Sequence, residues 1–216
     1  MTGKFITFEG GEGSGKSTQA RALAERLKAE GIGVVLTREP GGSAFAEQVR
    51  MLLLSRETAD HSALAEALMF SAARADHLER TIRPALAEGK WVVCDRFSDS
   101  TRVYQGAAGG LPKDVIAHLE RLVVEDTQPD ITIMLDLPAS DGLARAGDRM
   151  AKSEAAASDN YEARPIAFHE KLRDGFLVIA TAEPERCVVI DALDPPDSVA
   201  AQVWAAIEAR LLRRAG

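Results

Sequence analysis

A glycine-rich run near the N-terminus has the spacing of a phosphate-binding loop. Residues 10–17 read Gly-Gly-Glu-Gly-Ser-Gly-Lys-Ser, which fits the pattern Gly-x-x-x-x-Gly-Lys-Ser/Thr. The glycines let backbone N–H groups converge on phosphate oxygens, and the following helix N-terminus adds partial positive charge. Lys16 would reach the β- and γ-phosphates, and Ser17 would bind Mg²⁺. The run predicts a nucleoside triphosphate site formed by Gly10, Gly11, Glu12, Gly13, Ser14, Gly15, Lys16, Ser17 and Thr18.

Three apolar runs end in an aspartate that could help to hold the metal ion. These residues are Asp95, Asp136 and Asp191. Asp95 is preferred because Arg96 follows it directly, so that a metal ligand and an anion-binding group would lie together at the mouth of a cleft. A buried ion pair between Asp95 and Arg96 is the alternative interpretation.

Phe70 and Arg74 lie four residues apart in a stretch with helical periodicity, so they share one face. An aromatic ring can stack on a base while a guanidinium holds a phosphate through two hydrogen bonds. Taken alone, Phe70 is more often a core residue and Arg74 more often an exposed one. The run Arg38-Glu39-Pro40-Gly41-Gly42 follows an apolar run and is either a ligand-binding loop or a plain turn before a helix.

Arg145 and Arg149 are also four residues apart, and they precede a stretch that has no large apolar side chain, residues 151–160. This stretch is either an exposed helix end or a mobile flap that packs when ligand is bound. Cations on such a flap could close over the transferring phosphates and exclude water. An ordinary solvated helix face explains the two arginines equally well.

Alternating strands and helices must position these residues. Five short apolar runs have the composition of buried parallel strands, namely residues 5–8, 34–36, 91–94, 131–135 and 187–190. Helical periodicity fills the intervals: one helix stops at Gly31, a second ends before Pro84, a third covers 116–123, and a fourth runs from Ser198, as its N-cap, to Arg214. The order predicts an α/β fold in which crossover helices cover both faces of a parallel sheet.

Composition narrows the class of protein. The 216 residues suit one domain, and the formal net charge of −7 argues against a nucleic-acid partner. Two cysteines, Cys94 and Cys187, each adjoin an apolar run and are expected to be buried thiols. The sequence has no leader-like or membrane-spanning stretch, so we expect a cytoplasmic protein without a membrane partner.

With these motifs in order, the chain resembles the thymidylate kinases over essentially its whole length. The resemblance rests on the phosphate loop with its internal Glu12 and on Thr-Arg-Glu-Pro-Gly-Gly at 37–42. It also rests on Leu-Met-Phe-Ser-Ala-Ala-Arg at 68–74, and on Asp-Arg at 95–96 followed by Ser-Thr at 100–101 and Tyr-Gln-Gly at 104–106. It implies a P-loop NTPase fold with a five-stranded parallel sheet and a short mobile lid at about 145–162, all within a single domain, residues 1–216.

The resemblance also implies partners and residue roles. The partners would be ATP with Mg²⁺, dTMP, and a second copy of the chain in a homodimer. Phe70 would stack on thymine, Gln105 with Ser100 or Thr101 would read the base edge, and Tyr104 would crowd the sugar 2′ position. The dTMP phosphate would lie on Arg74 and Arg96, and Glu12 would face the sugar near its 3′-hydroxyl. The acceptor pocket would be lined by Arg38 and Pro40.

The resemblance leaves three candidates for the catalytic cation of the lid. The phosphate loop has Gly13 where some relatives carry a basic residue, which resembles the bacterial subgroup whose catalytic arginine comes from the lid. Arg149 is the first candidate, Arg145 the second and Lys152 the third. Relatives often carry Asp-Arg-Phe/Ile-Glu at the end of the lid, but this chain has Asp-Asn-Tyr-Glu at 159–162, so one expected arginine is missing.

Other functions remain open from the residues alone. The nearest is a kinase for a different nucleoside monophosphate or for a deoxynucleoside. A nucleotide-dependent switch is a rival of another class, but a GTPase switch should carry an Asn-Lys-x-Asp guanine-reading run, which this sequence lacks.

Overall fold

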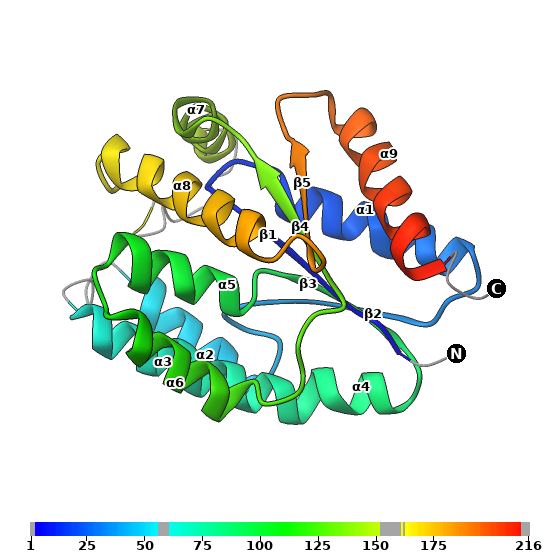
Figure 1. The fold of residues 1–216 in the computed structure, drawn as a ribbon, viewed down its shortest axis with the longest axis horizontal. Helices are drawn as coiled ribbons and strands as arrows, with labels where there is room; N and C mark the ends of the chain where they lie inside the picture. The colour runs from blue at the N-terminus through cyan, green and yellow to red at the C-terminus, as the bar shows by residue number, and fades with distance from the viewer. Residues whose placement is uncertain (1–2, 56–60, 152–160, 162, 213–216) are drawn as a thin grey trace.

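The computed structural model describes residues 3–55, 61–151, 161 and 163–212, without the side chains of 149–151. Within this part of the chain, five parallel strands form one sheet (Figure 1). Each predicted strand is present, one or two residues longer at its carboxyl end: β1 Phe5–Gly10, β2 Val34–Arg38, β3 Trp91–Asp95, β4 Ile131–Asp136 and β5 Cys187–Asp191.

The strand order is β2-β3-β1-β4-β5, which places β1 at the centre. After β1 the chain builds β2 and β3 on one side, and then it crosses over to build β4 and β5 on the other. The carboxyl end of β1 is therefore the point where the strand order reverses. Ligands of open parallel sheets bind at such a point, in the crevice outside the carboxyl ends of the strands.

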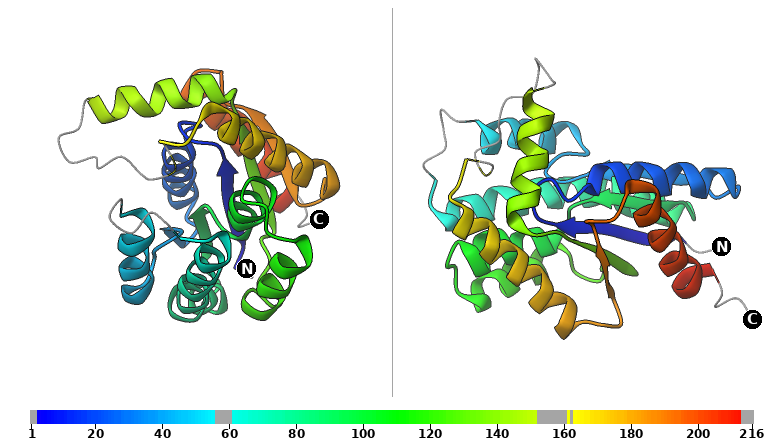
Figure 2. Two further views of the ribbon diagram at one scale, coloured as in Figure 1. Left: turned by 90° about the vertical axis from the view of Figure 1, so that its left-hand side faces the viewer. Right: turned by 90° about the horizontal axis from the view of Figure 1, so that it is seen from above.

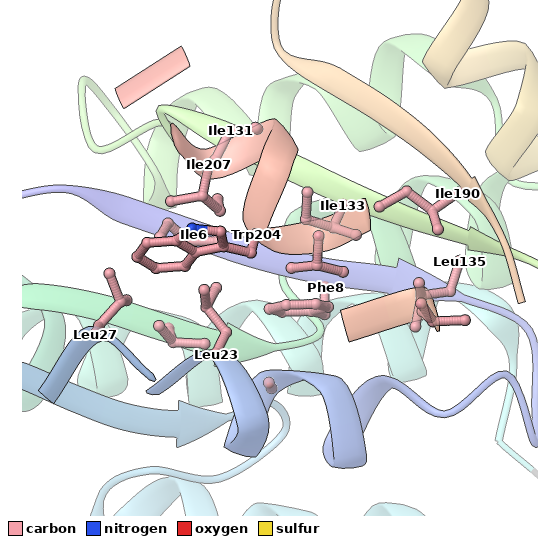
Figure 3. Packing of buried hydrophobic residues seen from close by; sticks show 14 of the residues in the cluster. Ile6, Phe8, Leu23, Leu27, Ile131, Ile133, Leu135, Ile190, Trp204 and Ile207 are labelled. Atoms are coloured by element: carbon pink, nitrogen blue, oxygen red, sulfur yellow. The ribbon is translucent and has the colours of Figure 1, made fainter. Parts of the chain in front are cut away.

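One face of the sheet is covered by helix α1, Lys16–Ala29, and helix α9, Pro196–Ile207. Side chains alternate across a strand, so Ile6 and Phe8 of β1 point to this same face. Figure 3 shows how they pack against Trp204 and the leucines of α1. The resulting cluster anchors α1, and with α1 the phosphate loop that precedes it: Ile6, Phe8, Leu23, Leu27, Ile131, Ile133, Leu135, Ile190, Trp204 and Ile207.

Most of the other helices lie on the opposite side of the sheet (Figures 1 and 2). Phe176 of α8 packs with Met134 of β4, and Leu78 packs with Phe5 of β1. Helix α7 contacts α8. The bounds are α2 Ala44–Leu54, α3 Ala63–His77, α4 Arg83–Ala87, α5 Ser98–Thr101, α6 Lys113–Val123, α7 Ala139–Ala151 and α8 Ile166–Ala182, with π-helical turns at Leu78–Ile82, Arg102–Ala108 and Glu208–Leu212.

Two predicted helix boundaries are wrong. The chain stays helical through Pro84, because a π-helical turn follows α3 and puts Pro84 in the first turn of α4. A proline is tolerated there, since the first-turn N–H groups have no partner within the helix. The last helix begins at Pro196 with Pro195 as its N-cap, so Ser198 lies inside it. Its predicted end at Arg214 falls outside the described residues.

Two further expectations concern the cysteines and the membrane. Cys94 and Cys187 are both free and buried, as the sequence predicts. Among the helices of the described residues, none has the length and apolar character needed to cross a bilayer.

Candidate active site

A cleft of about 920 Å³ opens beside the phosphate loop and the ends of β2 and β3. Its walls come from the segments that follow β1, β2 and β3, together with α2, α3 and residue 161. It therefore lies where the strand topology predicts a ligand. The cleft is lined by all the predicted acceptor residues and by much of the phosphate loop: Glu12, Gly13, Gly15, Lys16, Ser17, Thr18, Arg38, Pro40, Phe70, Arg74, Asp95, Arg96, Ser100, Thr101, Tyr104 and Gln105.

Lys16 is folded back onto the phosphate loop. Its ammonium donates to the Gly11 carbonyl at 2.6 Å and lies 3.3 Å from Ser14 Oγ. Burial and the nearby Arg96 lower the pKa of Lys16 to about 8, and Glu12 only partly offsets them. Nucleotide phosphates would restore the missing negative charge and hold Lys16 protonated.

Arg96 takes a backbone conformation that few residues other than glycine adopt, with φ of 69°. Its guanidinium donates to the Gly10 carbonyl at 3.2 Å, to Ser100 Oγ at 3.2 Å and to Glu12 Oε1 at 2.9 Å. Burial alone would lower the pKa of Arg96, but its electrostatic partners, Glu12 among them, raise it. The side chain is thus a fixed, permanently charged anion-binding group beside the phosphate loop.

Glu12 joins the phosphate loop to the acceptor side of the cleft. The same oxygen that receives the Arg96 bond also accepts the Tyr104 hydroxyl at 2.6 Å. Burial would raise the pKa of Glu12, but Arg96 and Lys16 outweigh burial and lower it to about 2. The carboxylate is therefore ionised at neutral pH and can only accept hydrogen bonds.

The oxygen atoms beside the phosphate loop fit a magnesium ion. Ser17 Oγ donates to Asp95 Oδ2, while Asp95 Oδ1 is buried and has no hydrogen-bond partner among the described residues. A hydroxyl and a carboxylate beside bound phosphates form the kind of ligand set that Mg²⁺ takes. The two alternatives are engaged elsewhere: Asp136 accepts two bonds from Arg173 at 2.7 and 2.9 Å, and Asp191 accepts the Leu193 N–H.

Arg74 lies deep in the wall of the cleft, with only 4% of the residue exposed. Its Nε donates to Glu39 Oε2 at 2.7 Å. Its Nη2 donates to the Phe97 carbonyl and to Thr101 Oγ1, each at 3.1 Å. The alternative interpretation of Arg74 as an exposed surface residue is therefore wrong. Its guanidinium instead contacts Thr101, one of the predicted base-reading residues. Phe70 is half-buried and packs against the α8 cluster while it lines the cleft.

Gln105 is almost fully buried at the inner end of the cleft. Its amide nitrogen Nε2 donates to Glu66 Oε2 at 3.0 Å and to the Tyr161 hydroxyl at 3.2 Å. The Tyr161 hydroxyl also donates to Glu66 Oε2 at 3.0 Å, and its ring meets the edge of Tyr104 at 5.3 Å between centroids. Gln105 and Tyr104 are therefore held by side chains from α3 and from residue 161.

The comparisons with known proteins agree with this geometry. The family model described as thymidylate kinase matches residues 8–203. The chain belongs to the thymidylate kinase family.

Individual relatives cover nearly the whole chain. A thymidylate kinase of Nitrobacter winogradskyi is 54% identical over 97% of this chain and 90% of its own length. A thymidylate kinase of Caulobacter vibrioides is 52% identical over 97% of this chain and 98% of its own. Among solved structures, the thymidylate kinase of Ehrlichia chaffeensis has a TM-score of 0.77 at 37% identity and covers 96% of this chain and 99% of that one. The shared fold is the five-stranded P-loop sheet described above.

For this thymidylate kinase family member, the lid cation stays a prediction. Arg145 of α7 donates to the Ala192 carbonyl at 2.8 Å. Arg149 belongs to the same helix, but its side chain lies outside the described part of the chain, and so does all of Lys152. Of the predicted lid, residues 145–162, the structure describes only the part in α7 and Tyr161. The stretch 151–160, predicted as a helix end or a mobile flap, lies almost entirely outside the described residues.

Several residues that shape the cleft of this thymidylate kinase family member were not predicted. Glu39 belongs to the Thr-Arg-Glu-Pro-Gly-Gly motif at 37–42, but nothing in that motif indicates that its carboxylate accepts a hydrogen bond from Arg74. The others contact the predicted residues only after folding, and no local spacing identifies them: Glu9, Arg50, Glu66 and Tyr161.

Proposed function

We propose that this chain transfers the γ-phosphoryl group of ATP to dTMP, which gives dTDP and ADP. Family membership supports the reaction. The observation that carries it is the single cleft in which a phosphate loop meets all nine predicted acceptor residues. A P-loop alone would fit a switch protein equally well, but a cleft that also brings the predicted acceptor residues beside the loop fits a second substrate.

The donor side of the cleft binds the triphosphate. In this proposal Lys16 and the backbone N–H groups of the phosphate loop hold the β- and γ-phosphates. Ser17 and Asp95 hold Mg²⁺, whose charge, when it is bound, neutralises developing negative charge on the phosphate oxygens. The partnerless buried oxygen of Asp95 supports this assignment.

The acceptor side binds the monophosphate. Arg96 holds its phosphate, since this guanidinium is charged, fixed by three bonds and adjacent to the phosphate loop. Phe70 stacks on the base, and Tyr104 with Glu12 borders the sugar. Arg74 is a second cation for the phosphate, and its bond to Thr101 also puts it within reach of the base-reading group.

Positioning and charge neutralisation account for the rate without a general base. The second ionisation of a phosphate monoester falls near pH 6, so the acceptor phosphate is already largely a dianion at neutral pH. The remaining obstacle is the repulsion between two anions, which Lys16, Arg96 and a cation from the lid reduce. Arg149 is our first choice for that cation, and closure of the lid would exclude water from the γ-phosphoryl group.

The decisive experiment is an assay of ADP release with MgATP and one acceptor at a time. We expect rapid turnover with dTMP, slower turnover with dUMP, and none with thymidine, because thymidine lacks the phosphate that Arg96 binds. Turnover on AMP or GMP instead would leave the proposed phosphoryl transfer unchanged but would mean that the base-binding residues recognise a purine. ATP hydrolysis that is independent of every acceptor would contradict the kinase and favour a nucleotide-dependent switch.

The same proposal includes a homodimer in the cytoplasm, with the chain as a single domain that carries the lid. Leu64 and Leu68 lie one turn apart on α3, and about half of each side chain is exposed, which favours an apolar contact with a second copy. Sedimentation analysis should give twice the chain mass, and Leu68→Glu should give a monomer. The two free, buried cysteines support a reducing compartment.

A further inference from the structure

The amide of Gln105 has its nitrogen end occupied from within the protein. Nε2 makes two hydrogen bonds, to Glu66 Oε2 and to the Tyr161 hydroxyl. Gln105 is only 1% exposed and Tyr161 only 5%, while Glu66 is half-buried. Water therefore has little access to the Gln105 end of these bonds, and breaking either of them would leave a buried polar group with one partner fewer.

The two partners leave one amide orientation. A carboxylate only accepts hydrogen bonds, so Glu66 requires the nitrogen of Gln105 and not its oxygen. The Tyr161 hydroxyl donates its one hydrogen to Glu66, so it can only accept a hydrogen bond from Gln105. A reversed amide would point its oxygen at two acceptors. The three hydrogen bonds among Gln105, Glu66 and Tyr161 thus identify which end of the amide is Nε2 and which is Oε1. The shape of the amide alone does not distinguish the two atoms.

The oxygen end of the amide is left for a ligand. Among the described residues, none donates a hydrogen bond to Gln105 Oε1. Gln105 lines the same cleft as Phe70, the predicted stacking residue, and Thr101. In the proposed function, a base whose face stacks on Phe70 turns its hydrogen-bonding edge toward Gln105.

We infer that Glu66 and Tyr161 are positioning residues that lock Gln105 with its oxygen toward the nucleobase, and that this lock selects bases with an N–H at ring position 3. The inference rests on the proposed function. Thymine and uracil carry that N–H and can donate to Oε1. Cytosine has a lone pair there instead, so two acceptors would face each other in a buried site, which is the arrangement that sites of this kind reject most strongly.

Glu66→Gln tests the lock. An amide at position 66 can donate as well as accept, so Gln105 becomes free to reverse and offer its nitrogen to cytosine. We expect the ratio of kcat/KM for dTMP to that for dCMP to fall about tenfold or more, the size of one buried hydrogen bond. The ratio for dTMP to dUMP should not change, because both bases carry the N–H and differ only in a methyl group.

Glu79→Gln is the matched control, since it makes the same substitution at an exposed position in the π-helical turn that follows α3. It should leave all three rates unchanged. Tyr161→Phe removes one of the two acceptors without removing the ring, and should lower the dTMP to dCMP ratio by a smaller factor. If Glu66→Gln does not fold, this second variant carries the test, with equilibrium binding of dTMP and dCMP as the readout.

Wild-type protein that binds pyrimidine monophosphates but does not phosphorylate dTMP would overturn the proposed function, while the binding ratio still tests the lock. Active wild-type protein whose Glu66 and Tyr161 variants lose activity equally on dTMP, dUMP and dCMP would show a structural role only. Wild-type binding of dCMP as tight as that of dTMP would also overturn the inference.

Discussion

Arg96 shows how much of this site depends on one residue. A positive φ costs a non-glycine residue about 1–2 kcal/mol, and such strain persists where the surroundings impose it. Here three hydrogen bonds hold the guanidinium between the phosphate loop and the α5 segment. With this backbone conformation the Arg96 side chain lines the cleft.

Arg96→Ala should lower kcat/KM for dTMP by about 10³-fold, because a preorganised charge next to the reacting phosphates is lost. Stability should change far less, by about 1–2 kcal/mol, since alanine removes an ion pair while Glu12 keeps its bond to Tyr104. Steady-state kinetics and thermal unfolding of the same preparation measure both effects.

The control for this prediction is Arg80→Ala, which removes an arginine with a 73% exposed side chain outside the cleft. It should leave kcat/KM unchanged. A folded Arg96→Ala protein that phosphorylates dTMP at the wild-type rate would rule out Arg96 as the phosphate-binding cation.

Residues that act within a short motif could be predicted, and residues that act across the fold could not. The phosphate loop is recognisable because its glycines, lysine and serine follow a fixed local spacing. Glu66 is 39 positions from Gln105 in the sequence and 95 positions from Tyr161. The roles of Glu66 and Tyr161 therefore depend on how α3 and residue 161 meet in space. A lone glutamate in a helix carries no local sign of such a contact.

Helix α7 and the phosphate loop approach each other at two glycines. A Cβ atom on Gly13 would lie 2.0 Å from the carbonyl oxygen of Gly142, and Gly13 also has a φ of 67°. No side chain fits there without moving the loop or the helix. The phosphate loop therefore cannot supply a cation from position 13, which agrees with a catalytic arginine on another element.

Gly13→Ala should lower kcat/KM for ATP by about 100-fold, because a shift of the loop by about 1 Å misplaces the γ-phosphate. Gly147→Ala is the matched control in α7, since its new Cβ meets nothing within 4 Å. It should keep full activity and raise stability by about 0.5–1 kcal/mol. Equal activity of the two variants would contradict the close approach of α7.

Strands were easier to predict than helices for a physical reason. A buried parallel strand is apolar on both faces, so each one stands out as a short continuous run. Helix α8, which was not predicted, spreads its buried residues over 17 positions among charged ones. The second predicted helix was ended before Pro84, and the start of α9 was placed at Ser198, because prolines usually end a helix, whereas here they occupy first turns.

Across the whole molecule, one buried carboxyl connects the centre of the sheet to the cleft. Glu9 of β1 accepts the N–H groups of Phe97 and Ser100 at 2.8 and 3.1 Å and the Ser100 hydroxyl at 2.6 Å. It thereby fastens the segment that follows Arg96 to the central strand. Burial, together with the neighbouring Asp99, raises the pKa of Glu9 to about 7.

The sign of the resulting pH dependence follows from proton binding. Between pH 4.5, the ordinary pKa of the carboxyl, and about 7, the folded protein holds a proton on Glu9 that the unfolded chain has lost. The contribution of Glu9 to stability is therefore fully present below pH 4.5 and disappears as the pH rises through 7. Its size is at most about 3 kcal/mol, at 1.36 kcal/mol for each unit of pKa difference.

Glu9→Gln should remove this dependence. The amide keeps the geometry, because its oxygen can accept both N–H groups and its nitrogen can donate to Ser100 Oγ, yet it does not titrate. Denaturant unfolding measured from pH 5 to 8 should show the wild-type free energy falling relative to the variant, with the largest separation above pH 7. Parallel curves would mean that Glu9 is ionised throughout this range. In that case the segment after Arg96 would be held by a charged group at the centre of the sheet.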